Sequence, residues 1–157
     1  MDAKARRMEI NLQTLGTGVI AISIWSLIKF AMSFFVYLSD ILKDIPQEYS
    51  FVIAILWGGI ILDSLLYIYV GISARSESKG KRKTILYIVL TIILTVIIGI
   101  TVLGEIASLF YAENGFASII ITIFIDVTSA VIMIDLAVNA LGIRKMRKQS
   151  QEVRHES

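Results

Sequence analysis

Residues 85–104 read ILYIVLTIILTVIIGITVLG, a run that contains no charged side chain. At a rise of about 1.5 Å per residue, a helix of this run is about 30 Å long, which is the thickness of the hydrocarbon core of a bilayer. Three further runs, residues 16–38, 51–72 and 117–142, are similarly long and apolar. The sequence therefore predicts an all-α integral membrane protein, in which residues 1–157 form a single membrane domain built as a four-transmembrane-helix bundle.

The composition of the whole chain agrees with this class. Hydrophobic residues make up 56% and charged residues 18% of the chain, whereas a typical soluble domain is about 45–50% apolar and about 25% charged. The chain has no cysteine, and its single histidine, His155, lies in the polar tail. A thiolate metal site is therefore excluded, and a nucleophile activated by histidine is not expected.

Basic side chains are distributed unevenly over the segments that flank the apolar runs. Residues 1–15, 73–84 and 143–157 together hold thirteen Lys and Arg side chains, whereas residues 39–50 and 105–116 hold one. Short segments rich in Lys and Arg stay on the cytoplasmic side of a membrane. We therefore expect an N-in/C-in protein with residues 39–50 and 105–116 external. The cysteine-free, isoleucine-rich composition favours the plasma membrane of a bacterium, and no nucleic-acid partner is needed to explain the basic residues.

Three ionisable side chains lie inside the predicted spans at similar depths. Lys29, Asp63 and Asp126 each lie roughly 13–18 Å from the outer end of their span. A charge at the centre of a membrane helix costs about 2.5–3.5 kcal/mol, so each one requires a partner or a function. Polar residues on the same helix faces extend this predicted intramembrane cluster: Ser26, Ser33, Tyr67 and Thr95. The cluster is either a structural ion pair with a neutral acid, or a proton relay or cation site.

A further acidic residue, Asp135, points away from this cluster. Nine residues separate it from Asp126, so at 100° per residue the two side chains lie on opposite faces of one helix. Asp135 shares its face with Thr128 and Asn139. We expect this second polar face to contact another chain, in a homo-oligomer or with another membrane protein, or to contact the basic loop of residues 75–83.

Two other segments carry local expectations. Lys79, Lys81, Arg82 and Lys83 form a basic cluster that anchors the loop on the cytoplasmic side and is a possible contact for anionic lipid headgroups. The adjacent Gly58 and Gly59 predict a close approach of a neighbouring helix. We also expect a short interfacial helix over residues 2–14 and a frayed tail from residue 149 onward.

No sequence motif points to a reaction, a cofactor or a metal. The chain has no glycine-rich phosphate loop, no paired metal-ligating histidines and no serine with a suitable base. We therefore expect a non-enzymatic protein. The first hypothesis is an accessory or regulatory subunit of a membrane complex, docked through Asp135. The alternative is a small ion- or proton-linked transporter or channel that uses Lys29, Asp63 and Asp126.

Overall fold

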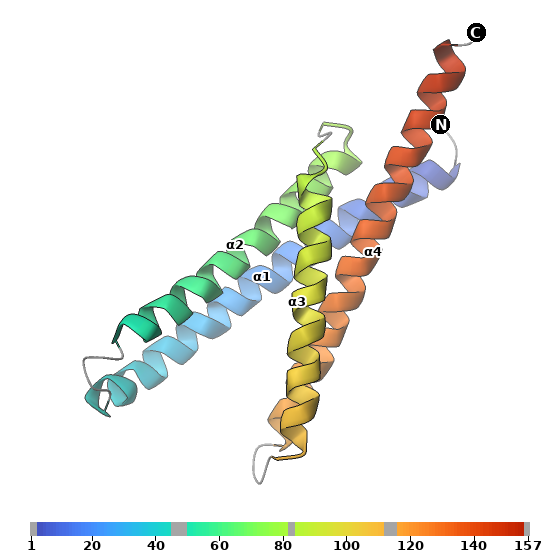
Figure 1. Cartoon of the computed structure of the whole chain (residues 1–157). Coiled ribbons are helices and arrows are strands. Elements are labelled where there is room, and N and C mark those ends of the chain that lie inside the picture. The colour runs from blue at the N-terminus through green and yellow to red at the C-terminus, as the bar shows by residue number, and fades with distance from the viewer. Residues whose placement is uncertain (1–2, 45–49, 82–83, 112–115, 156–157) are drawn as a thin grey trace.

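A computed structural model of the chain describes residues 3–44, 50–81, 84–111 and 116–155 (Figure 1). Within these residues the backbone forms four α-helices: α1 (Ala3–Asp44), α2 (Ser50–Ser78), α3 (Leu86–Leu109) and α4 (Phe116–His155). Each helix is long and apolar enough to cross a membrane. The predicted all-helical architecture is confirmed, and the four candidate spans indicate a multi-pass membrane protein.

The helices extend beyond the apolar runs at several ends. The segment predicted as a separate interfacial helix is the first part of α1, and α4 continues to His155, so the expectation of a frayed tail is wrong. For α1 the physical reason is tertiary packing. Glu9 near the start of α1 pairs with Arg147 on α4, and Met8 lies against Gly142, so the start of α1 has contacts that stabilise its helical turns. The end of α4 is stabilised within the helix, where the Ser150 hydroxyl donates to the Met146 carbonyl oxygen at 3.1 Å and Lys148 lies 3.9 Å from Glu152.

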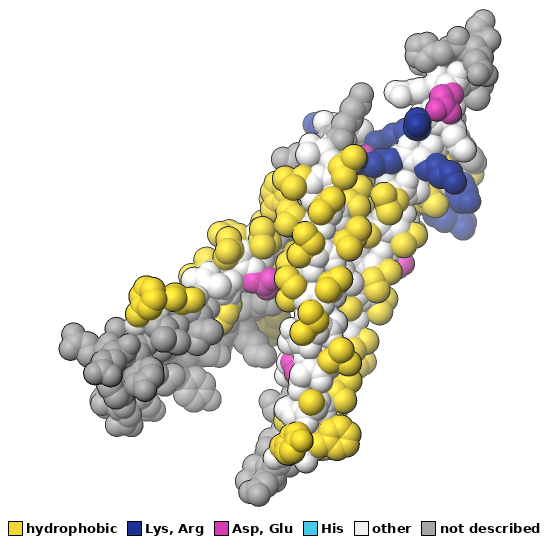
Figure 2. Space-filling model, viewed as in Figure 1, with side chains coloured by type: hydrophobic (Ala, Val, Ile, Leu, Met, Phe, Trp, Pro, Cys, Tyr) yellow, Lys and Arg dark blue, Asp and Glu magenta, His cyan; other side chains and the backbone are white. Residues whose placement is uncertain are grey.

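The four helices form two antiparallel hairpins. α1 packs most extensively against α2 and α3 against α4, while α1 also crosses α4. Figure 1 shows that the hairpins lie close together where the termini and the α2–α3 connection are, and diverge toward their own loops. We call the end with the termini the basic end, because Lys79, Arg144, Lys145, Arg147 and Lys148 lie there. Figure 2 shows dark-blue side chains gathered at this end, over α4 and the start of α1, while apolar side chains cover most of the rest of α3 and α4.

The buried core occupies the half of the bundle nearer the basic end, where the hairpins meet. Its fully buried side chains come from all four helices: Leu12, Val19, Val70, Tyr87, Met133, Leu136 and Ile143. Many other Ile, Leu and Val side chains are exposed. This distribution is what a helix bundle surrounded by lipid requires, since lipid solvates apolar side chains as well as a protein core does.

α1 and α2 approach each other closely at Gly16 and Gly71. A Cβ built on Gly71 would lie 2.6 Å from the carbonyl oxygen of Gly16, and a Cβ on Gly16 would lie 2.8 Å from the carbonyl oxygen of Gly71. Only two glycines allow the backbones to come so close. The predicted close approach at Gly58 and Gly59 is wrong for the described part of the chain, because no described atom of another element lies within 4 Å of a Cβ at either position.

Candidate functional site

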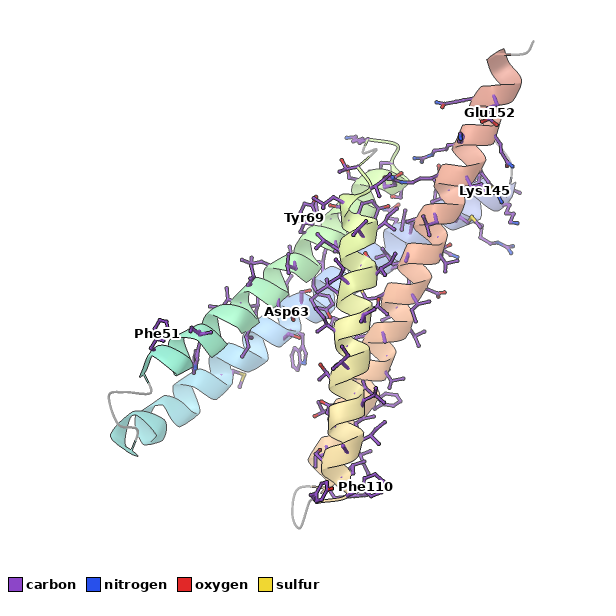
Figure 3. The ribbon with its side chains drawn as sticks, viewed as in Figure 1. Phe51, Asp63, Tyr69, Phe110, Lys145 and Glu152 are labelled. Carbon is purple, nitrogen blue, oxygen red and sulfur yellow. The ribbon has the colours of Figure 1, made fainter. Side chains whose placement is uncertain are left out.

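A partly open polar cavity lies between the two hairpins, and two of its lining residues, Ser26 and Asp63, are exposed. It has a volume of about 130 Å³ and is lined by side chains from all four helices. Four members of the predicted intramembrane cluster line it: Ser26, Asp63, Tyr67 and Asp126. Figure 3 places Asp63 on α2 near the point where the hairpins diverge. The structure therefore brings together polar residues from three helices, α1, α2 and α4.

The lining of this cavity offers mainly oxygen atoms. Besides the two carboxylates, Ser23, Ser64 and Ser129 contribute hydroxyl groups. The hydroxyls of Ser23 and Ser129 donate to carbonyl oxygens of their own helices at 2.9 Å, so their lone pairs remain available as acceptors. The volume is sufficient for several water molecules. Such a cavity is suited chemically to hydrated cations or to protons shared between carboxylates.

Ser23 and Ser64 were not part of the predicted cluster. Each is almost fully buried. Ser23 lies three positions before Ser26 in the sequence, and Ser64 directly follows Asp63. A helical-face argument gives Ser23 as a neighbour of Ser26. Ser64 is 100° away from Asp63 on the helix, so only the position of α1 and α4 identifies it as a cavity residue.

The remaining predicted cluster residues lie elsewhere. The Thr95 hydroxyl donates to the carbonyl oxygen of Thr91 at 2.8 Å, and Thr95 does not line the cavity. The side chains of Lys29 and Ser33 lie outside the described part of the chain. Among the described residues, no group of three or more His, Cys, Asp or Glu side chains is arranged to hold a metal ion.

A second polar site, at the basic end, is built around the buried Glu77. Its side chain is only 3% exposed. Arg144 forms a two-pronged hydrogen bond with it, with Nη2 donating to Oε2 at 2.7 Å and Nε to Oε1 at 3.2 Å. The same guanidinium donates to the carbonyl oxygen of Thr84 at 2.6 Å and lies 5.8 Å from the ring centroid of Tyr87. One arginine thus connects α2, the α2–α3 connection, α3 and α4.

Arg147, one turn further along α4, extends this network to α1. Its Nη2 donates to Oε1 of Glu9 at 2.9 Å, and its Nη1 donates to the Glu77 carbonyl oxygen at 3.2 Å. The network borders a cavity of about 630 Å³. Because charge-assisted hydrogen bonds require fixed geometry, the four residues Glu9, Glu77, Arg144 and Arg147 hold the basic ends of three helices in register. We call them the Glu77 network.

The sequence reasoning did not single out the Glu77 network. Its arginines were treated only as topological charges, and Glu77 was not considered. One signal was present: Glu77 is the only carboxylate in a connecting segment that contains five basic residues. A lone carboxylate among cations is expected to pair, but its partners lie 67 and 70 residues away, and their identity depends on how the helices cross.

The predicted assembly face on α4 presents an unusual carboxylate. Asp135 is exposed, and within the described residues it forms no ion pair. The Asn139 amide donates to the backbone carbonyl oxygen of Asp135 at 2.8 Å, and the Thr128 hydroxyl to that of Phe124 at 2.7 Å. The surrounding exposed side chains of α4 are apolar: Val131, Ile134, Val138 and Leu141.

Two residues of the predicted basic cluster, Lys79 and Lys81, are described and exposed. Arg82 and Lys83 lie outside the described residues. Lys79 lines the cavity beside the Glu77 network and also a second cavity, on the other side of the end of α2, which Lys81 lines as well.

Comparison with known proteins finds no matching family model, no similar curated protein and no similar solved structure. The fold defines the class: an all-helical chain whose four candidate spans suggest a multi-pass membrane protein.

Proposed function

We propose that this protein is a non-enzymatic accessory subunit of a membrane complex, inserted N-in/C-in in the plasma membrane of a bacterium. The orientation is supported by the basic end, because Lys79, Arg144, Lys145, Arg147 and Lys148 all lie at the end of the bundle with the termini. The positive-inside rule assigns such an end to the cytoplasm.

One observation carries the proposed role: Asp135 is exposed within an apolar face of α4. A carboxylate that faces lipid is costly, and such residues face protein or water in membrane proteins. No described helix of this chain covers it. The partner is therefore a transmembrane segment of another protein that offers a basic or amide donor to Asp135.

Substituting Asp135 tests this role. We expect Asp135→Leu to leave the bundle folded, because leucine suits a lipid-facing position, and to lower the partner-bound fraction roughly tenfold, since one interhelical hydrogen bond contributes about 1–2 kcal/mol. The measurement is the native mass and composition of the complex extracted gently from its own membrane. Asp63→Asn serves as the control and should retain the partner.

The outcomes of this experiment are distinguishable. A stoichiometric second protein that is lost from Asp135→Leu supports the accessory role. A complex with the same mass and composition in both variants contradicts it. A homo-oligomer in the wild type would also contradict the accessory role, because the contact would then join copies of this chain.

A second candidate function, transport of a cation or proton, is favoured by the oxygen-lined cavity with Asp63 and Asp126. In liposomes that contain the purified protein, this reading predicts an ion or proton flux that Asp63→Asn or Asp126→Asn abolishes and Asp135→Leu leaves intact. A flux that is absent, or insensitive to both asparagine substitutions, would rule out the cavity as a transport site.

A further inference from the structure

The end of α2 is closed by a tight capping turn. The Lys81 amide donates to the carbonyl oxygen of Ser76 at 3.0 Å, and the Gly80 amide donates to that of Glu77 at 2.9 Å. Gly80 has a φ of 73°, which is the left-handed conformation that glycine adopts without strain. This is the Schellman pattern of hydrogen bonds. It folds the chain back, so that Lys81 lies over the last turn of α2.

This turn borders an open surface cavity of about 260 Å³ whose charged lining is entirely basic. Ile72, Arg75, Ser76, Lys79 and Lys81 line it. Within the described part of the chain, none of the three basic side chains forms an ion pair. The cavity beside the Glu77 network differs, because two carboxylates line that one. An anion entering the cavity at the turn therefore meets three cations and one hydroxyl.

The packing of α1 positions one of these cations. The Arg75 side chain is partly buried, and its Cγ lies 3.2 Å from the position that a Cβ on Gly16 would occupy. The stem of Arg75 is therefore held where α1 and α2 cross. Since a restrained side chain loses less conformational entropy on binding, Arg75 is partly preorganised for a ligand.

The capping turn lacks the apolar contact that commonly stabilises a turn of this kind. A Schellman turn is frequently accompanied by an apolar contact between the residue after the glycine and the last helical turn. Here those positions carry Lys81, Ser76 and Arg75. Ile72, one turn before Ser76, is exposed. This face of α2 thus changes from apolar to basic over one helical turn. The change matches the boundary in a bilayer between the apolar acyl chains and the charged headgroups.

We propose that Arg75, Ser76, Lys79 and Lys81 form a binding site for the phosphate group of an anionic phospholipid. The acyl chains lie along the apolar surface that includes Ile72. The inference depends on the N-in/C-in insertion proposed above and is independent of the accessory role. In this proposal, lipid binding depends on the conformation of the capping turn. A basic segment that only fixes the topology would depend on its charges alone.

The test uses the full-length protein in an uncharged detergent. Phosphatidylglycerol or phosphatidylcholine is added, and native mass spectrometry counts the bound lipids. We expect the wild type to retain phosphatidylglycerol in preference to phosphatidylcholine. Lys79→Gln/Lys81→Gln is expected to lower this retention roughly thirtyfold, whereas Lys145→Gln/Lys148→Gln, which removes the same charge from α4, lowers it much less. Equal losses in the two double variants would overturn the proposal.

Substitutions at Gly80 distinguish the effect of the turn conformation on lipid retention from the effect of charge. Gly80→Ala strains the left-handed turn and is expected to lower phosphatidylglycerol retention at unchanged net charge. Gly80→Asn, a residue that tolerates this conformation, preserves the retention. If Gly80→Ala retains lipid as well as the wild type does, the site does not depend on the turn and the proposal fails.

Inorganic phosphate distinguishes the two sources of a phosphate group. In the same assay, millimolar phosphate should leave the bound phosphatidylglycerol in place, because the free ion gains nothing from the apolar surface. Displacement of the lipid by phosphate at that concentration would mean that the site binds a free anion, and would overturn its assignment to a phospholipid.

Discussion

Replacing Glu77 with glutamine is expected to lower the free energy of unfolding by about 3 kcal/mol, the lower end of the range for breaking a buried ion pair. The lower end applies because the partners are partly exposed: the Arg144 side chain is 21% exposed and that of Arg147 36%. Glutamine keeps the size of the side chain but leaves two guanidinium groups without their shared carboxylate. The measurement is equilibrium unfolding of the purified protein in mixed detergent micelles.

A matched control is available on α4. Glu152 lies 3.9 Å from Lys148, and its side chain is 61% exposed. Because exposed ion pairs contribute about 0–1 kcal/mol, Glu152→Gln should change the stability little. Similar losses for the two glutamine variants would contradict the role assigned to Glu77. A double-mutant cycle with Arg144→Gln then isolates the coupling between Glu77 and Arg144.

Replacing Gly71 with alanine is expected to cost about 1–3 kcal/mol of stability, the usual range for inserting a group into a packed interface. The new methyl group would lie 2.6 Å from the Gly16 carbonyl oxygen and 2.6 Å from Cγ1 of Ile20. Ile20 can move its side chain, but the carbonyl oxygen belongs to the α1 backbone. The two helices must therefore separate, which also loosens the contacts around Val70 and Ala74. The same unfolding assay measures the loss.

The control for this substitution lies on the same helix. Gly59→Ala introduces a methyl group with no described atom of another element within 4 Å, and alanine favours the helix over glycine by roughly 0.5–1 kcal/mol. Opposite signs for the alanine variants at Gly71 and Gly59 are expected. A loss of stability at Gly59 as large as that at Gly71 would show that the contact with Gly16 is not the cause.

Much of the intramembrane site was predictable, whereas the basic end was not. Ser26, Asp63, Tyr67 and Asp126 were expected to lie together because intramembrane polar residues require polar neighbours and helical periodicity assigns each to a face. The same reasoning included Thr95, which bonds to its own helix instead. A threonine hydroxyl can satisfy itself on a backbone carbonyl, so its presence on a face does not establish that it contacts a cluster.

Close packing was predicted at the wrong glycines for a similar reason. Gly16, Gly58, Gly59 and Gly71 are all compatible with a close approach, and the adjacent pair was the more conspicuous pattern. The helices instead approach at Gly16 and Gly71, next to the buried core and the Glu77 network. The crossing point depends on which buried side chains pack together, and the spacing of glycines does not specify it.

The sequence by itself determined the four apolar helices and the segregation of basic residues between them. Both properties are local: a helix satisfies its own backbone hydrogen bonds, and the length of each apolar run is set by its own residues. Only the tertiary structure decided that Glu77 pairs with Arg144, that Gly71 lies against Gly16, and that Ser64 joins the cavity. These contacts join residues far apart in the chain, so they depend on the register and crossing of helices.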